Sequence, residues 1–398
     1  MKITAVKVTP VNIPLNFQYV WSMGVAAGYS KVVVEVETDQ GITGIGEAPS
    51  TSLLPEIQGI ADLLMGQDPM DIADCETAAI PEWKTLLIAG VGDGVAKAFG
   101  AFDTALWDIK GKVADMPLYQ LLGGAYRKEI PFTEYFGFEG ISQADKTYTV
   151  SYDPQAVADY CLRMKEEHGS TMFEGKLATH DDIRVDMDTV ARVREAVGPE
   201  CMIRLDANYG YSMATMKQML RELEPLNIRN LEDPALTFEA MAELKRHTAI
   251  PLGTHQCDIS RAAAAGAPDN FCGHPAALGG IMNTMRFIGA CQQLGKNFWF
   301  YSGDAGITST VYLHMAAACD HLTEPSQSLF RWQDMDVINE GPYRPKNNVI
   351  RVPEGPGLGV TLDRDAMEIL HKDYCDNGPS DQYYNFKNPA RFTRLPRA

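Results

Sequence analysis

The sequence has no run of about 20 consecutive apolar residues, the length that a membrane-spanning helix requires. Its N-terminal segment also lacks the long apolar core and small-residue cleavage site of a secretory signal peptide. That segment alternates between apolar and polar residues, as a β-strand does. These absences predict a cytoplasmic protein that has no membrane partner.

Paired cysteines and clustered positive charge are absent as well. The eight cysteines stand singly, without the Cys-x-x-Cys spacing of zinc or thioredoxin-like centres, so we expect reduced and mostly buried thiols. The formal net charge is −17, and no basic stripe runs along the chain. Because nucleic-acid binding needs clustered lysine and arginine to neutralise phosphates, we predict no nucleic-acid partner.

The N-terminal part of the chain has strand patterns followed by a helix pattern. Apolar residues alternate over residues 2–11, and again over residues 31–49 on both sides of a turn. The polar and aromatic segment between them, residues 16–30, is too long for a simple turn and is predicted to be a loop. Helical periodicity follows over residues 95–113. We predict a small α+β domain over residues 1–125.

From residue 126 onward, strand patterns alternate with helix patterns. The strand candidates are Pro131–Phe136, Thr171–Leu177, Cys201–Asp206, Ile228–Glu232, Ile250–Gly253, Asn270–His274, Asn297–Tyr301 and a weak one at Ser328–Trp332. Ser212 and Thr237 are placed to cap the helices that follow them. Eight such units favour a closed parallel barrel over an open sheet, whose nucleotide-binding glycine motifs are missing. We predict a (β/α) barrel over residues 126–335 and a C-terminal segment, 336–398, that packs back on the first domain.

Polar side chains stand where successive barrel strands end. They are Lys176, Asp206, Asn208, Glu232, Asp233 and His255, from the second to the fifth strand. Each interval between them is about one strand–helix unit, and the carboxyl ends of barrel strands share one mouth. We therefore expect these side chains to converge there.

The converging residues favour one kind of chemistry. Two carboxylates and a third polar ligand suit Mg²⁺, which completes its coordination with water and substrate oxygens. Such an ion can stabilise the enediolate that forms when a proton leaves the carbon next to a carboxylate. Lys176, on the neighbouring strand, is placed to be the base, and positive charge nearby would lower its pKa.

The chain resembles the enolase superfamily over nearly its whole length, in particular the mandelate racemase and glucarate dehydratase-like acid-sugar dehydratases. The resemblance is carried by KVVVEVETDQGITGIGEAP, by AFDTALWDIKGKVADMPLYQLLGG and by the strand ends RLDANYG and NLEDP. It implies a modified TIM barrel whose mouth is covered by the N-terminal α+β domain, a capping domain completed by the C-terminal segment. It also implies a homo-oligomer, either a dimer or an octamer.

The resemblance implies roles for individual residues. Asp206 and Glu232 would bind the metal, and His255, in PLGTH, stands at the third ligand position. Imidazole suits Mn²⁺ better than Mg²⁺, so Mn²⁺ is the alternative metal, and His255 could instead hydrogen-bond a metal-bound water. Lys176 matches the second lysine of the family's Lys-x-Lys motif, the usual base. Glu174 replaces the first lysine and would bring a negative charge near the substrate.

Substrate selection is expected at residues facing the barrel mouth. From the capping domain these are the loop residues Tyr19, Trp21 and Met23, and from the barrel Tyr135, Glu174 and Asn208. The segment 301–306, which follows the seventh strand, is expected to contribute as well. The expected partner is a small acid sugar or hydroxy acid.

The sequence departs from the family at its usual Asp–His dyad on the sixth and seventh strands. His274 stands where the aspartate is expected, and Phe300 or Tyr301 where the histidine should fall. Three alternatives follow: Lys176 acts alone as base and then acid; His274, Tyr301 or Asp304 supplies the second proton-transfer group; or the site binds a ligand without turnover.

The function that we predict is dehydration of an acid sugar to a 2-keto-3-deoxy product, after metal-assisted removal of the α-proton. The alternative within enzymes is epimerisation or cycloisomerisation of a related hydroxy acid or lactone. Outside enzymes, the alternative is a metal-containing binding protein. A barrel of another family, such as an aldolase with Lys176 as Schiff base, would leave Asp206 and Glu232 unexplained.

Overall fold

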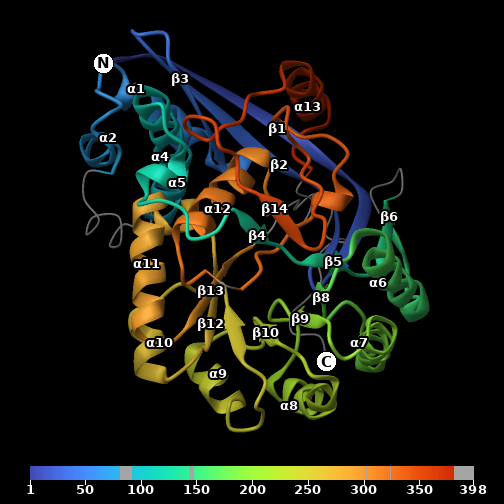
Figure 1. Cartoon of the computed structure of the whole chain (residues 1–398). Coiled ribbons are helices and arrows are strands. Elements are labelled where there is room, and N and C mark those ends of the chain that lie inside the picture. The colour runs from blue at the N-terminus through green and yellow to red at the C-terminus, as the bar shows by residue number, and fades with distance from the viewer. Residues whose placement is uncertain (81–91, 143–147, 302, 323, 381–398) are drawn as a thin grey trace.

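The computed structural model of the chain describes residues 1–80, 92–142, 148–301, 303–322 and 324–380. Two main sheets form its frame, one of five strands and one of seven (Figure 1). A third sheet pairs only two strands, β4 and β14. The structure confirms the predicted barrel with an N-terminal α+β domain.

The five-stranded sheet belongs mainly to the N-terminal part. Its order is β3-β2-β1-β6-β7, with β1 at Ile3–Trp21, β2 at Gly24–Thr38, β3 at Thr43–Ala48, β6 at Glu139–Ser142 and β7 at Tyr148–Ser151. Every paired neighbour in it is antiparallel. Three helices accompany it, α1 (Leu54–Leu64), α2 (Ile72–Ala79) and α4 (Gly92–Ala114), and α4 confirms the predicted helical periodicity.

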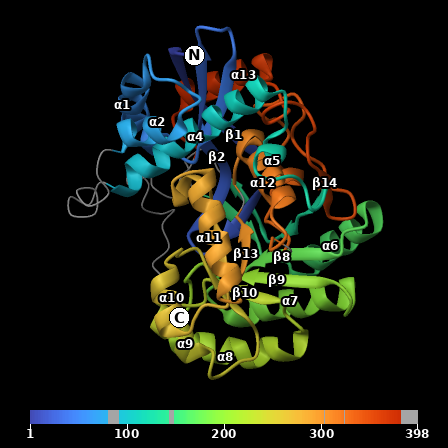
Figure 2. The same ribbon diagram turned by 60° about the vertical axis from the view of Figure 1, so that its left-hand side comes forward.

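Alternation along β2 assigns its two faces to different neighbours. Val32 and Val34 are fully buried in a cluster with Phe99 of α4, whereas Val33 is buried in the cluster that contains Leu370 of α13 (Arg364–Asn377). Successive strand residues point to opposite faces. The sheet is therefore covered on both sides, and Figure 2 shows α4 and α13 on either side of β1 and β2.

The loop predicted for residues 16–30 is wrong. β1 and β2 continue through this segment as one long hairpin that turns at Ser22 and Met23. The physical reason is that Phe17, Tyr19 and Trp21 alternate along β1, a pattern that favours strand. A shift in register between Pro14 and Tyr19 interrupts the pairing, so the strand can bend there.

The seven-stranded sheet is parallel throughout and has the order β13-β12-β11-β10-β9-β8-β5. Its strands are β5 (Glu134–Phe136), β8 (Met172–Lys176), β9 (Met202–Asp206), β10 (Asn230–Glu232), β11 (Leu252–Thr254), β12 (Asn270–Gly273) and β13 (Asn297–Phe300). The connecting helices are α6 (Pro154–His168), α7 (Ile183–Val197), α8 (Met213–Leu223), α9 (Phe238–Leu244), α10 (Ile259–Ala265), α11 (Ile281–Gln293) and α12 (Gly306–Ala318). Ser212 and Thr237 cap α8 and α9, as predicted.

The eighth strand predicted at residues 328–332 is wrong, because Phe330–Trp332 forms a 3₁₀ helix. The segment just before it takes the eighth place instead. Ser326 bridges Phe132 in a parallel sense, and the Gln327 amide donates to the Phe300 carbonyl at 2.9 Å. Residues 326–327 thus link β13 to the chain leading into β5 and close the ring.

The C-terminal segment joins both parts of the molecule. β14 (Val349–Arg351) pairs antiparallel with β4 (Glu129–Pro131), and α13, a helix that the sequence analysis did not predict, packs on β1. His371 of α13 lies 2.7 Å from the Pro10 carbonyl oxygen. We propose that the chain divides into the three parts predicted from the sequence, 1–125, 126–335 and 336–398. Residues 381–398 lie outside the described part.

Among the described helices, none is both long enough and apolar enough to cross a membrane.

Candidate active site

Successive strand ends bring the predicted residues together at one end of the barrel. In the parallel register, Lys176 at the end of β8 pairs with Asp206 at the end of β9, and Asp206 pairs with Glu232 at the end of β10. Lys176 Nζ lies 2.5 Å from Asp206 Oδ2. His255 follows β11 directly. The side chains that the sequence predicted to converge are therefore neighbours in space.

Asp206, Glu232 and Asp233 form a compact group of buried carboxylates. One ligand oxygen from each lies within 4.8 Å of the others, and all three side chains are 0–1% exposed. Burial, followed by the charge of Asp206, raises the pKa of Glu232 to about 8. Mutual repulsion of this kind is what a divalent cation relieves, and three oxygens suit Mg²⁺.

Two unsatisfied oxygens support the same interpretation. Within the described residues, Asn208 Oδ1 is buried and has no hydrogen-bond partner, and Glu232 Oε1 is buried and has only an ion-pair contact, with His255. Buried acceptors without a donor are costly and therefore need an explanation. Asp206 is held from the other side, because the Asn208 amide nitrogen and its Nδ2 each donate to Asp206 at 2.8 Å. The chemistry of the donor set therefore fits a hard cation.

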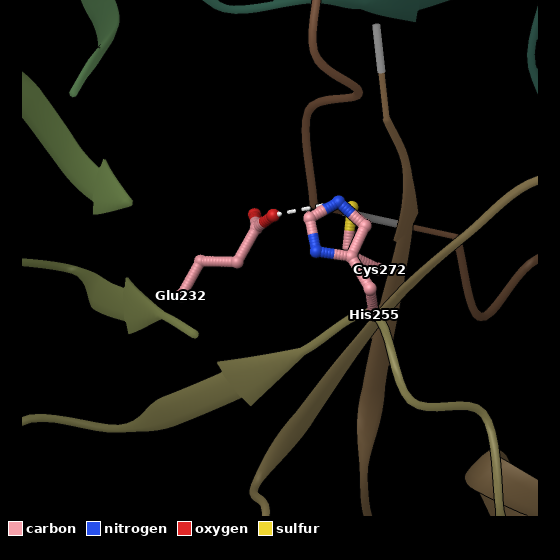
Figure 3. A group of neighbouring side chains, drawn as sticks. All are labelled: Glu232, His255 and Cys272. Atoms are coloured by element: carbon pink, nitrogen blue, oxygen red, sulfur yellow. Dashed lines mark ion pairs between the residues drawn. The ribbon is translucent and has the colours of Figure 1, made fainter. Parts of the chain in front are cut away.

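His255 lies between two of the carboxylates. Its Nδ1 is 2.5 Å from Asp233 Oδ2. Its Nε2 is 3.2 Å from Glu232 Oε1, the ion pair drawn in Figure 3. Burial alone would lower the pKa of His255, but Asp233 and Glu232 outweigh it and raise that pKa to about 10. An imidazolium has no lone pair for a metal. A cation at this place would therefore need His255 neutral or moved aside.

A second set of donors, Glu232, His255 and Cys272, also lies within ligand range. Figure 3 shows the histidine ring between the glutamate and the cysteine sulfur. Thiolate and imidazole ligands suit zinc, whereas Mg²⁺ takes oxygen ligands. Burial, first of all, raises the pKa of the Cys272 thiol well above its usual value. The carboxylate group is the better site for Mg²⁺ because all three of its donors are oxygens.

Glu232→Gln should abolish the stabilisation that a bound divalent cation gives. Removing a supporting residue around a metal typically costs 10–100-fold in affinity, so a direct ligand should cost about 100-fold or more. We expect 5 mM Mg²⁺ or Mn²⁺ to raise the melting temperature of the wild type and not that of the variant, since ligand binding stabilises the native state. Glu239→Gln, at an exposed side chain of α9, is the control. An equal shift in all three proteins would contradict the assignment.

Aromatic rings surround Lys176. Its Nζ lies 5.9 Å from the centre of the Trp21 ring and 5.6 Å from that of Tyr135. Burial would lower the pKa of Lys176, but the adjacent Asp206 carboxylate outweighs it, and that pKa is raised well above its usual value. We expected positive charge near Lys176 to lower its pKa. That effect must therefore compete with the opposite effect of the Asp206 carboxylate.

Glu174 lies one layer below the mouth, on the same face of β8 as Lys176. It is fully buried, accepts from Arg204 Nη2 at 2.5 Å, and does not line the cavity described below. The negative charge of Glu174, which we expected near the substrate, is thus compensated by Arg204 within the barrel. Gln327 bridges Glu174 and Glu232, donating to them at 2.6 and 2.7 Å, and so orients a candidate metal ligand.

His274 is occupied at both ring nitrogens. Its Nδ1 accepts from the Ala276 amide at 2.9 Å, so Nε2 carries the proton and donates to Asp304 Oδ1 at 3.1 Å. The side chain is 1% exposed and is absent from the cavity lining. Tyr301 does reach the cavity, and its ring lies 5.2 Å from each of His255 and His274. Residue 302, within the predicted 301–306 segment, lies outside the described residues.

The site opens into a cavity of about 400 Å³ between the capping domain and the barrel. Its lining includes Tyr19, Trp21 and Met23 from the hairpin turn, and Tyr135, Lys176, Asn208, Asp233, His255 and Tyr301 from the barrel. The hairpin is fixed there because Ser22 Oγ donates to the Asn208 carbonyl at 3.3 Å. A larger cavity of about 630 Å³, beside Phe138 and Arg331, contains none of the predicted site residues.

Three residues of this region were not singled out from the sequence. Lys31 of β2 lines the cavity, Gln327 orients Glu232, and Arg204 compensates Glu174. Arg204 had a signal, because a charged residue within an otherwise apolar strand needs a buried partner. Lys31 lies in a strand where polar and apolar residues alternate, so a lysine there does not stand out in the sequence. Gln327 lies in a segment without regular secondary structure, where no pattern indicates its role.

Comparison with known proteins places the chain in a family. Residues 3–123 match the mandelate racemase / muconate lactonizing enzyme N-terminal domain, and residues 156–366 match the enolase C-terminal domain-like family. The chain therefore belongs to the enolase superfamily, as the sequence resemblance implied. Family membership rules out the alternative of an aldolase barrel from another family.

The relatives differ in the reactions that they catalyse. A probable glucarate dehydratase of Streptomyces coelicolor is 29% identical, over 95% of this chain and 93% of its own length. An N-succinyl-L-Arg/Lys racemase of Bacillus cereus is 26% identical, over 93% and 98%. An enolase structure from Pseudomonas fluorescens, with bound magnesium, potassium and tartrate, superposes with a TM-score of 0.86 at 25% identity over 100% and 99%.

Proposed function

We propose that the protein is a magnesium-dependent dehydratase of a small acid sugar, which it converts to a 2-keto-3-deoxy acid. The observation that carries the proposal is the contact of Lys176 with Asp206 at the edge of a cavity that Asp233 and His255 also line. Removal of an α-proton needs a base and positive charge near the carboxylate, and this arrangement offers a place for both.

In this proposal Asp206 and Glu232 would hold the Mg²⁺ together with Asp233 or His255, and Mn²⁺ is the alternative ion. The bound ion would supply the positive charge that makes the carbon next to a substrate carboxylate more acidic. Lys176 removes the α-proton, and Trp21 and Tyr135 keep water away from its amine. Asn208 orients Asp206 and, with Tyr301, contributes polar contacts to the substrate.

Epimerisation or cycloisomerisation stays the second candidate, because a racemase is among the relatives. Epimerisation shares the first proton transfer with dehydration, but reprotonation on the other face then replaces loss of the β-hydroxyl. A binding protein without turnover would need no amine beside the metal ligands. The presence of Lys176 at 2.5 Å from Asp206 favours an enzyme.

A mass-spectrometric screen in D₂O tests the proposal. The protein with Mg²⁺ or Mn²⁺ meets a set of mono- and diacid sugars that includes D-glucarate, D-galactonate and tartrate, with an EDTA-treated sample as control. We expect metal-dependent loss of one water from at least one acid. Metal-dependent deuterium uptake without water loss would support an epimerase instead, and the absence of both reactions with both metals would overturn the proposal.

A further inference from the structure

The capping domain places a lysine in the active-site cavity. Lys31, on β2, is 5% exposed and lines the same cavity as Lys176 and His255. A buried lysine needs a compensating partner, and such residues concentrate at functional sites. Lys31 therefore requires an explanation that its place in an antiparallel sheet does not provide.

The partner of Lys31 belongs to the barrel. Its Nζ lies 2.9 Å from Asp304 Oδ1 and donates to the Pro49 carbonyl at 3.1 Å. Asp304, which follows β13, also accepts from His274 and, at 2.5 Å, from the Tyr312 hydroxyl. Of the three donors that converge on the Asp304 carboxylate, only Lys31 lines the cavity.

Lys31 and Lys176 approach the cavity from different sides. Lys176 ends β8 and Asp304 follows β13, and these two strands are five places apart in the order of the parallel sheet and three apart across the closure at residues 326–327. The two amines therefore stand at separate parts of the barrel rim. A substrate between them would present its α-carbon to one amine and a neighbouring carbon to the other.

We propose that Lys31 is the general acid that protonates the departing β-hydroxyl, an inference that rests on the proposed dehydration. Lys176 takes the α-proton, and the electrons of that C–H bond first move toward the substrate carboxylate to give an enediolate. They then form a double bond between the α- and β-carbons. The β-carbon–oxygen bond breaks, and the Lys31 ammonium gives one proton to the leaving oxygen, which departs as water. Lys31 then regains a proton from solvent, and Lys176 releases one.

The two lysines differ in a way that suits these opposite roles. Asp206, the partner of Lys176, is a candidate metal ligand, so its charge is shared when a cation is bound. Asp304 lies apart from the carboxylate group and keeps its charge for Lys31 and His274. An ammonium held beside a buried carboxylate remains protonated, as an acid must be before it acts.

The competing explanation is that Lys31 only joins the two parts of the molecule. Glu47 of β3 makes a similar connection, since its carboxylate accepts from the Ala305 and Thr308 amides at 2.8 and 2.9 Å. Glu47 is buried and does not line the cavity. Glu47→Gln is therefore a matched control for a connection that lacks access to the substrate.

The test compares wild type, Lys31→Arg, Lys31→Met and Glu47→Gln, each loaded with Mg²⁺ and checked by a thermal melt. Arginine keeps the positive charge beside Asp304 but does not release a proton in proteins. The probes are D-glucarate, D-galactonate and their analogues with fluorine in place of the β-hydroxyl, because fluoride leaves without protonation. Water loss, fluoride release and α-proton exchange with D₂O are measured separately.

We expect both Lys31 variants to lose water elimination by about 10²–10⁴-fold while α-proton exchange and fluoride release stay within about threefold of wild type. Glu47→Gln should melt earlier and keep the wild-type ratio of the three rates. If Lys31→Arg lost all three rates in parallel, or kept its rate of water elimination, the assignment of Lys31 as the general acid would be overturned. The proposed dehydration itself would stand. A wild type that performs none of the three would overturn the dehydration as well.

Discussion

Lys176→Ala should lose turnover by about 10³-fold or more while its affinity for Mg²⁺ is kept or increased. The loss follows because a positioned base contributes about 10²–10⁴-fold and because the aromatic surroundings leave little room for water to replace it. The retained affinity follows because the Lys176 ammonium lies 2.5 Å from Asp206 and competes with a cation for that carboxylate. Steady-state assays and calorimetric titration with Mg²⁺ measure the two effects.

Lys372→Ala is the matched control for this variant, since Lys372 is exposed on α13, far in sequence from the site. It should keep both turnover and metal affinity. Lys176→Ala with more than a tenth of wild-type turnover would remove Lys176 from the role of base. Loss of turnover together with loss of Mg²⁺ affinity would instead assign Lys176 to holding the carboxylates in place.

Arg204→Met should destabilise the fold by about 3–5 kcal/mol, the usual cost of leaving a buried charge without its partner. Arg204 and Glu174 are both fully buried, and Arg204 also lies 4.3 Å above the Trp299 ring. Methionine fills part of the same space but leaves the Glu174 carboxylate with neutral donors only. Urea unfolding followed by tryptophan fluorescence measures the change.

The double variant Glu174→Gln with Arg204→Met should recover part of that loss, because neither member of the pair is then a buried charge without its partner. Removing the exposed arginine of the Arg192–Asp188 pair should cost less than about 1 kcal/mol. If Arg204→Met and Arg192→Met lowered the free energy of unfolding equally, the buried Arg204–Glu174 pair would contribute no more to stability than an exposed pair. If the double variant were less stable than Arg204→Met, packing rather than charge would explain the result.

The sequence located the strand ends that carry the candidate site, because that part of the problem is local. A polar residue that follows a short apolar run marks the end of a strand, and parallel strands bring such residues together. Lys176, Asp206, Glu232 and His255 were found in this way. Gln327, which orients Glu232 from across the barrel, was not found because the two residues are 95 positions apart in sequence. Arg204 was not found because its partner, Glu174, lies on the neighbouring strand β8.

The missed elements of the fold have the same cause. Residues 16–30 form strand because the two halves of this alternating segment pair with each other across the turn, and residues 326–327 take the eighth place because β13 and the Phe132 backbone lie on either side. Helix α13 has a clear amphipathic sequence but lies beyond a stretch rich in glycine and proline. Lys31 shows most clearly what a sequence pattern cannot predict, since its partner Asp304 belongs to the other domain.

The way the capping sheet is assembled has a consequence for how the chain is made. β1 obtains its second neighbour, β6, only after the first barrel strand has been synthesised, and α13 covers it only when residues 364–377 have left the ribosome. Until then the face of the β1–β2 hairpin that carries Val33 remains uncovered, and an exposed apolar surface of this kind favours aggregation. The first segment to be translated is thus among the last to be covered.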